Sequence, residues 1–247
     1  MILGLGARDL VTLAQEARAA GLPRPIHVVG DGAAGLAAAL AEGGTPSLVR
    51  VTDGAEGASA VVLCLDDPSV APLALLRGAA RSGIPVIVAT SRARRVPYVL
   101  AEDIVRGTAP VAEAVAERLA AVLGGDAIAL AGELPVLREA VLARREAATA
   151  TAAAWIAARG AGSGPRLPVL SLLQARLLRQ LARARGEAPP RAVEATARTV
   201  ATEVGAALGA GLVARAVVRR LPRTRPLEAV VAYGVTRLLA QMARLAH

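Results

Sequence analysis

Short apolar runs alternate with helix-forming stretches through the first half of the chain, and this alternation constrains the fold more than any other feature. Stretches of about a dozen residues with helical spacing separate the runs. Parallel strands joined by helices produce this pattern, because each crossover returns the chain to the same end of the sheet. We therefore expect an α/β fold with a doubly wound, mostly parallel sheet of about five strands. The predicted strands lie at residues 25–30, 47–52, 60–65, 84–89 and 96–100.

Strand signals end near residue 134, and the rest of the chain predicts helices only. Residues 136–158 form an Ala-rich stretch with the length of one long helix, and residues 227–245 predict the last helix. Between them, leucines recur on one helical face, at Leu170, Leu173, Leu177 and Leu181. The change predicts two domains, an α/β domain at residues 1–133 and an all-helical domain at residues 134–247.

The two halves of the chain differ in charge. Residues 1–146 carry 14 Arg and 16 Asp or Glu, whereas residues 147–247 carry 15 Arg and 4 Glu. A basic module of this kind attracts an anionic membrane surface or an acidic protein partner. Nucleic acid is not expected, because Trp155 and Tyr233 are the only aromatic residues there for base stacking. The candidate contact residues are Arg176, Arg179, Arg183, Arg215, Arg219, Arg220, Arg223 and Arg225.

Several residue types are absent or rare. The chain has no Lys, no Asn and no Phe, so all 29 basic residues are Arg. A P-loop needs a lysine on the phosphates, and the guanine-reading motif Asn-Lys-x-Asp needs both missing residues, so a self-sufficient P-loop NTPase is excluded. Two His and the single Cys64 exclude most zinc sites and any disulfide framework. We predict no metal site and no catalytic set, and an enzyme is the less favoured class.

A glycine-rich loop follows the first predicted strand and opens a helix. Gly30, Gly32 and Gly35 match the pattern G-x-G-x-x-G. In a dinucleotide site these glycines allow a tight turn, a close approach of the pyrophosphate and close packing of helix on strand. The phosphates then lie at the helix N-terminus, and an acid after the second strand binds the ribose. Asp53 stands there, 18 residues after Gly35, so the pattern favours NAD or FAD.

Two other interpretations of this loop stay open. Gly30 and Gly35 also have the spacing of a P-loop, but Leu36 and Ala37 stand where Lys and Ser or Thr are required. The loop also suits a tight turn that a parallel sheet needs without any ligand. Asp31 opposes phosphate binding, because it adds a negative charge to the cradle.

Other polar residues near predicted strand ends have structural explanations. Asp66-Asp67 and Glu102-Asp103 are typical of solvated strand ends that cap a following helix. Residues 91–95 (SRARR) are typical of a solvated loop, although an anion would fit there. His27 stands within an apolar strand, which favours a buried histidine with a hydrogen-bond partner.

The helical half resembles the YcjF-like family, an uncharacterised helical domain found beside Era-like GTPase domains and associated with membranes. The resemblance covers residues 135–247 and supplies no catalytic residues. It rests on LPVLSLLQARL at 167–177, GE at 186–187, VGAALGAGL at 204–212, LP at 221–222 and VAYGVTR at 231–237.

The first half fits that resemblance as a degenerate GTPase. Residues 60–66 resemble the GTPase strand that ends in Asp, and residues 84–89 resemble the strand before the guanine motif. Residues 90–93 (TSRA) replace that motif, and too few residues separate Gly35 from Ala60 for a switch region. The resemblance therefore implies a pseudo-GTPase.

These observations lead to three hypotheses. The first is a non-catalytic scaffold, in which a pseudo-GTPase-like or Rossmann-like domain carries a basic helical domain that associates with a membrane surface or a protein partner, without a cofactor. The alternative is a dinucleotide-binding protein, including an oxidoreductase, that binds NAD or FAD. The third is a subunit that forms homo-oligomers through residues 203–220, where Gly205, Gly209 and Gly211 suit close helix packing.

The chain shows no targeting or membrane-spanning segment by its sequence pattern. Charges at Arg8, Asp9 and Glu16 interrupt the first apolar stretch before a signal peptide can form. The longest apolar window, residues 204–214, is about half the ~20 residues of a span. We expect a cytoplasmic protein, peripheral on the inner membrane under the first hypothesis.

Overall fold

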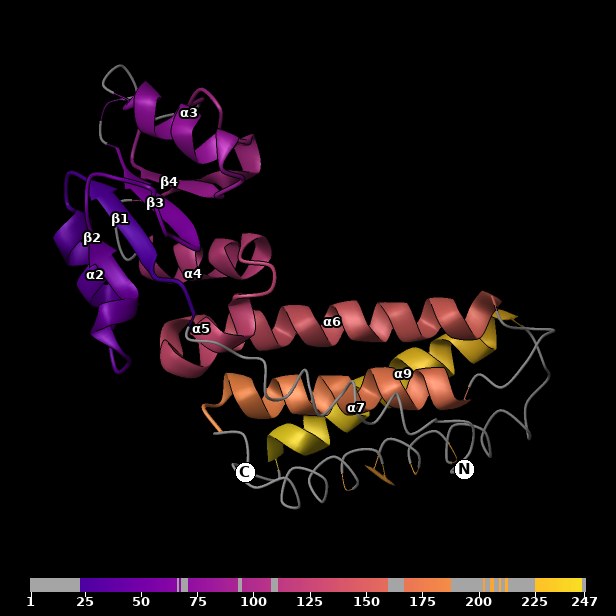
Figure 1. Cartoon of the computed structure of the whole chain (residues 1–247). Coiled ribbons are helices and arrows are strands. Elements are labelled where there is room, and N and C mark those ends of the chain that lie inside the picture. The colour runs from indigo at the N-terminus through magenta and orange to yellow at the C-terminus, as the bar shows by residue number, and fades with distance from the viewer. Residues whose placement is uncertain are drawn as a thin grey trace. The chain divides into compact units, whose positions relative to one another are not determined.

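A computed structural model of the chain confirms the predicted fold class, an α/β sheet followed by a helical region (Figure 1). The structure describes residues 23–65, 67, 71–92, 95–107, 111–159, 167–187 and 225–245, together with residues 202, 205, 206, 209 and 212.

The sheet has five parallel strands in the order β2-β1-β3-β4-β5. All five residues of the central strand β3 are buried, which is typical of a strand covered by helices on both faces. Figure 1 shows α3 on one face of the sheet and α2 and α4 on the other. The strands are β1 (Ile26–Gly30), β2 (Val49–Val51), β3 (Ala60–Cys64), β4 (Val86–Thr90) and β5 (Ile104–Arg106).

The helices around the sheet follow the apolar spacing of the sequence. Helix α2, for example, buries Ala33, Ala37 and Leu40 at intervals of four and three residues. The four helices are α2 (Ala33–Leu40), α3 (Leu73–Arg81), α4 (Val111–Val122) and α5 (Ala127–Glu133), and short 3₁₀ turns lie at η1 (Pro46–Leu48) and η3 (Ala101–Asp103).

The predicted fifth strand was wrong. Residues 96–100 form a turn, and β5 lies at Ile104–Arg106 instead. Pro97 cannot donate a ladder hydrogen bond, and Tyr98 has a φ of 63°, outside the extended region. Val96 is buried within this turn. Its apolar side chain therefore indicated a buried position, and not a strand. Helix α5 was not predicted from the sequence.

Among the described residues, three long helices follow the sheet: α6 (Pro135–Arg159), α7 (Leu167–Ala184) and α9 (Arg225–Leu245). Their contact is lined by small side chains. Ala153 and Ala157 of α6 and Ala232 of α9 form a buried cluster, against which Leu170 and Leu173 of α7 pack. Because alanine leaves the helix axes close together, this Ala-rich packing explains the Ala-rich sequence of α6.

The chain forms two compact units. The first, called here the sheet unit, comprises residues 21–141 with residues 184–186. The second, called here the helical unit, includes residues 142–183 and 187–247. The chain passes from one unit to the other within α6, between Val141 and Leu142.

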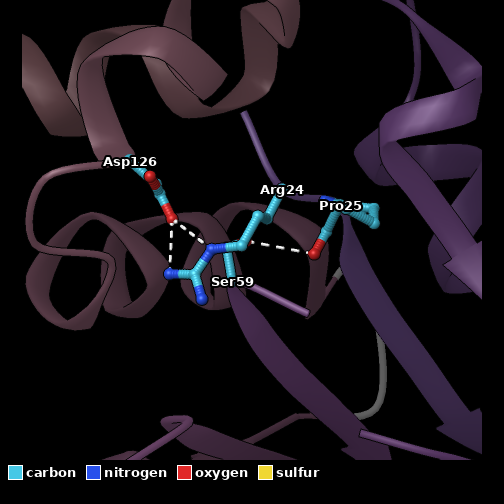
Figure 2. Close-up of polar contacts among 4 residues, drawn as sticks. All are labelled: Arg24, Pro25, Ser59 and Asp126. Atoms are coloured by element: carbon cyan, nitrogen blue, oxygen red, sulfur yellow. Dashed lines mark hydrogen bonds and ion pairs between the residues drawn. The ribbon is translucent and has the colours of Figure 1, made fainter. Parts of the chain in front are cut away.

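Polar contacts close the amino end of the sheet unit (Figure 2). Arg24 donates from Nε and Nη2 to Oδ2 of Asp126, at 3.2 and 2.9 Å. The Ser59 hydroxyl and backbone N–H both donate to the Pro25 carbonyl, at 3.1 and 2.8 Å. These contacts fix the entry to β1 against the segments before β3 and α5.

Candidate functional site

The strand order places a topological switch point between β1 and β3. The chain leaves β1 toward β2 on one side and leaves β3 toward β4 on the other. In doubly wound sheets, ligands bind outside the carboxyl ends of the strands at this point. The glycine-rich loop of residues 30–32 follows β1 and therefore lies there.

Gly30 is required by the packing of the chain itself. Its φ is 98°, and a Cβ built on it would lie 2.2 Å from the carbonyl oxygen of Cys64. Gly30 pairs in register with Cys64, so a side chain here would separate β1 from β3. This glycine is explained without any ligand.

Gly32 is the N-cap of α2 in the left-handed conformation, with a φ of 75°. No side chain caps the helix, and its first turn contains no acidic residue. The loop and the first turn are largely exposed at Asp31, Gly32 and Ala34. Backbone N–H groups in a first turn such as this one hydrogen-bond anions well, because they have no partner within the helix.

Gly35 does not perform the role that the dinucleotide pattern assigns to it. It lies within α2, is exposed, and a Cβ at this position would meet no atom within 4 Å. The face of α2 that packs on the sheet carries Ala33 and Ala37 instead. Because α2 already begins at Ala33, Gly30 and Gly35 also do not enclose a P-loop. The turn between β1 and α2 is short and tight.

Asp53 lies in the segment that follows β2. Asp53 is exposed two residues after the end of β2, and the preceding Thr52 N–H donates to the Val28 carbonyl at 3.1 Å. His27 is 8% exposed, and its Nδ1 lies 2.9 Å from the Gly54 carbonyl. Since a carbonyl only accepts, Nδ1 carries the proton. His27 is therefore a buried, hydrogen-bonded histidine, as predicted, and it holds the loop of Asp53.

Several other polar residues were predicted near strand ends, and the structure describes part of them. The prediction of Glu102-Asp103 as a solvated strand end that caps a helix was wrong, because both residues lie in η3 before β5 and Asp103 is buried. They pair instead with Arg118 of α4, whose Nε lies 2.5 Å from Asp103 Oδ1 and whose Nη2 lies 3.2 Å from Glu102 Oε1. Asp67 is exposed after β3, and Asp66 lies outside the described residues. In the part of the chain that the structure describes, no three His, Cys, Asp or Glu side chains are grouped to hold a metal ion.

The predicted basic residues divide between described and undescribed segments. Arg176 is exposed on α7, whereas Arg179 and Arg183 are half-buried. Arg225 begins α9. Arg215, Arg219, Arg220 and Arg223 lie outside the described residues.

The structure describes two of the three glycines that were predicted to pack helices together, and both have free space beside them. A Cβ on Gly205 or Gly209 would meet no atom within 4 Å. Gly211 lies outside the described residues.

The outer face of α9 carries four exposed apolar side chains, with the exposed Gln241 among them, and the sequence pattern did not single it out. Its exposed residues are Val230 at 67%, Leu238 at 56%, Met242 at 60% and Leu245 at 87%. At 100° per residue these four lie within about 120° of the helix circumference. The buried Ala232, Thr236 and Ala240 lie on the opposite side. The sequence signal for this surface is that apolar residues occur on both sides of the α9 helix.

Buried polar contacts join the helices of the helical unit. Glu146 of α6 is 3% exposed, and its carboxylate lies 3.0 Å from Nε of Arg237 and 3.1 Å from Nη2 of Arg244, both on α9. Gln174 of α7 donates to the Thr236 hydroxyl at 3.1 Å. The partners are 62 or more residues apart in the chain, so local patterns gave no sign of these pairs.

In comparisons with known proteins, no family model matches the chain, and no curated protein or solved structure matches it significantly. The helices of the described segments include none that is both long and apolar enough to cross a bilayer.

Proposed function

We propose that the protein is a non-catalytic interaction protein whose helical unit attaches it to an anionic membrane surface. The outer face of α9, with Val230, Leu238, Met242 and Leu245, is the observation that carries this proposal. An exposed apolar face on a basic unit suits the membrane interface, where apolar side chains enter the acyl boundary and positive charge attracts anionic lipids. The resemblance to the membrane-associated YcjF-like family agrees with it.

The apolar contribution comes from side chains that are now in water. Burying a Val, Leu or Met side chain completely contributes about 1.5–3 kcal/mol. These four are 56–87% exposed, so each retains about half or more of that contribution for a partner. The face curves outward on a single helix, and a bilayer accommodates such a face without a complementary pocket.

The electrostatic contribution comes from the excess of Arg. Residues 147–247 carry 15 Arg and 4 Glu. Each Arg close to an anionic leaflet adds about 1 kcal/mol, and this attraction fades beyond a Debye length of about 8 Å at physiological salt. A membrane is favoured over an acidic protein because the apolar face and the positive charge match acyl chains and anionic headgroups together. Binding should therefore require anionic lipid and weaken with salt.

Vesicle co-sedimentation tests this proposal with a matched pair of variants. Leu238→Gln/Met242→Gln changes two exposed residues of α9, and Leu73→Gln/Leu100→Gln changes two residues of the sheet unit that are 47% and 63% exposed. With phosphatidylglycerol vesicles, the α9 variant should lose at least about tenfold in partitioning, and the control should bind like the parent.

Two outcomes contradict the proposal. One is equal binding of both variants, which removes the role of α9. The other is binding that depends on neither anionic lipid nor salt, which removes the electrostatic contribution. Far-ultraviolet circular dichroism of each variant establishes that the helices have formed.

The second candidate function is dinucleotide binding at the switch point. The specific observation in its favour is that Gly30 and Gly32, both with positive φ, stand at the carboxyl end of β1 while Asp53 follows the adjacent β2. This arrangement supplies the tight turn, the uncapped helix N-terminus and the ribose acid of such a site. The exposed position of Gly35 weighs against it, so it stands second.

A thermal-shift screen with NAD, NADP, FAD, GTP, GDP and ATP with magnesium tests this candidate. A ligand at 100 times its Kd stabilises the native state by about 2.7 kcal/mol. For a ligand that binds at this loop, Asp53→Asn should weaken binding, because it loses the carboxylate for the ribose. Asp31→Asn should strengthen binding, because it removes a negative charge beside the phosphates. Equal effects of the two variants, or no shift with any ligand, would refute the assignment.

A further inference from the structure

Helix α7 buries two polar side chains whose hydrogen-bonding capacity the described protein atoms do not satisfy. Ser171 is fully buried, and Gln174 is 3% exposed. Neither Ser171 Oγ nor Gln174 Oε1 has a hydrogen-bond partner. Leaving a buried hydroxyl or carbonyl oxygen unsatisfied is costly, so two such atoms on one helix face require an explanation.

The orientation of the Gln174 amide follows from its neighbour. The Thr236 hydroxyl donates its single proton to the Ala232 carbonyl at 2.8 Å. Thr236 can therefore only accept from Gln174, so the amide nitrogen faces Thr236 at 3.1 Å. Turning the amide over would place two acceptors against each other. Oε1 of Gln174 is consequently the amide atom that does not face Thr236, and it accepts no hydrogen bond from the described residues.

Ser171 stands three residues before Gln174, on the same side of α7. Side chains at this spacing have their Cβ atoms about 5–6 Å apart. One water molecule that hydrogen-bonds both side chains, at about 2.8 Å each, joins oxygen atoms up to about 5.6 Å apart. The Ser171 hydroxyl both donates and accepts, whereas Gln174 Oε1 only accepts. A small molecule between them must donate to the amide oxygen and either donate to or accept from the hydroxyl.

We propose that an internal water molecule binds between Ser171 Oγ and Gln174 Oε1 and is a structural part of the α7–α9 contact. Water is the ligand that fits, because both atoms are neutral and a cation would lack a carboxylate among them. The water completes a chain that runs from Ser171 through Gln174 and Thr236 to the backbone of α9. Buried water usually makes two to four such bonds and is costly to remove.

The sign of the stability change in Ser171→Ala tests the proposal. With the water bound, the variant loses a hydrogen bond and strands the water, so Tm should fall by about 2–4 °C, the shift expected for one hydrogen bond in a chain of this size. With no water, the variant removes an unsatisfied hydroxyl, and Tm should rise. Thr151→Ala is the matched control, because Thr151 is exposed on α6 and its hydroxyl donates to the Ala147 carbonyl within the same helix.

Oxygen-17 magnetic relaxation dispersion of water gives a second measurement that does not depend on stability. The parent protein should show a long-lived internal water whose contribution is lost in Ser171→Ala and kept in Thr151→Ala. A Tm that rises in Ser171→Ala, or a dispersion that is unchanged by it, would overturn the proposal.

Discussion

The sheet unit and the helical unit treat buried polar groups differently. In the sheet unit, the buried polar side chains His27, Ser59, Thr90 and Asp103 each have a hydrogen-bond partner within the unit. In the helical unit, the corresponding side chains are Glu146, Ser171, Gln174 and Thr236. Three of these four keep an atom without a well-aligned hydrogen bond. Among these eight buried side chains, those of the sheet unit are all hydrogen-bonded within the unit, whereas three of those in the helical unit are incompletely satisfied.

The same difference holds for exposed apolar side chains. The sheet unit exposes Val51 on β2, Leu73 on α3, and Tyr98 and Leu100 in the turn of residues 96–100. The helical unit exposes more of them, and α9 alone carries Val230, Tyr233, Leu238, Met242 and Leu245. Scattered apolar residues are normal on a protein surface, but a concentration on one helix marks a contact surface. The described residues thus concentrate exposed apolar side chains on one helix of the helical unit, as the proposed membrane attachment requires.

The largest expected effect tests whether close backbone contacts hold the sheet unit. In Gly30→Ala, the new Cβ would collide with the Cys64 carbonyl, and alanine would adopt a φ of 98°. The collision and the backbone strain each cost about 1–3 kcal/mol. The free energy of unfolding should fall by about 4 kcal/mol, measured by urea denaturation.

Gly35→Ala is the control for this change, because it alters the same loop region in open space within α2. Alanine favours a helix interior by about 1 kcal/mol over glycine, so this variant should be stabilised. Equal effects at the two positions would contradict the idea that the sheet unit depends on the fit at Gly30.

The next effect concerns the ion pairs of Glu146 in the helical unit. Glu146→Gln leaves Arg237 and Arg244 without their carboxylate, and breaking a buried ion pair costs about 3–5 kcal/mol. The two arginine side chains are 39% and 30% exposed and regain some hydration, so a loss of about 3 kcal/mol is expected. Urea denaturation followed by circular dichroism measures it.

Glu117→Gln is the matched control, because Glu117 is exposed on α4 of the sheet unit. Its effect should stay within about 0.5 kcal/mol. A small loss in Glu146→Gln would show that the helical unit does not rely on buried charge, which would weaken the contrast between the two units.

The fold was predictable where burial follows a local period, and the candidate surfaces were not. The strands around Val28 and Val62 are continuous apolar runs, so length and composition identified them. Residues 96–100 have equally apolar side chains, but Pro97 and the positive φ of Tyr98 make them a turn. Local apolar character thus predicts burial better than it predicts the backbone conformation.

The outer face of α9 could not be predicted for a different reason. The sequence of α9 shows apolar residues on all sides, but only packing decides which side is covered. The Ala232 side contacts α6 and α7, and the Leu238 side does not. The pairing of Glu146 with Arg237 and Arg244 also depends on the arrangement of distant helices, which a local period does not encode. The glycine loop was located correctly, but its third glycine was not needed for packing.

The smallest expected effect sharpens the comparison by testing an exposed ion pair of the sheet unit. Arg24 donates to Asp126 with good geometry, as in Figure 2, but the Arg24 side chain is 62% exposed. Exposed ion pairs contribute about 0–1 kcal/mol, because water solvates both charges in the unfolded chain and salt screens them in the folded one. Asp126→Asn should therefore lower the free energy of unfolding by less than about 1 kcal/mol, and the loss should shrink further in 1 M NaCl. A loss as large as that of Glu146→Gln would mean that the amino end of the sheet depends on this charge. The polar contacts of the sheet unit would then be as critical as those of the helical unit, and the difference between the units would lie in their exposed apolar surfaces alone.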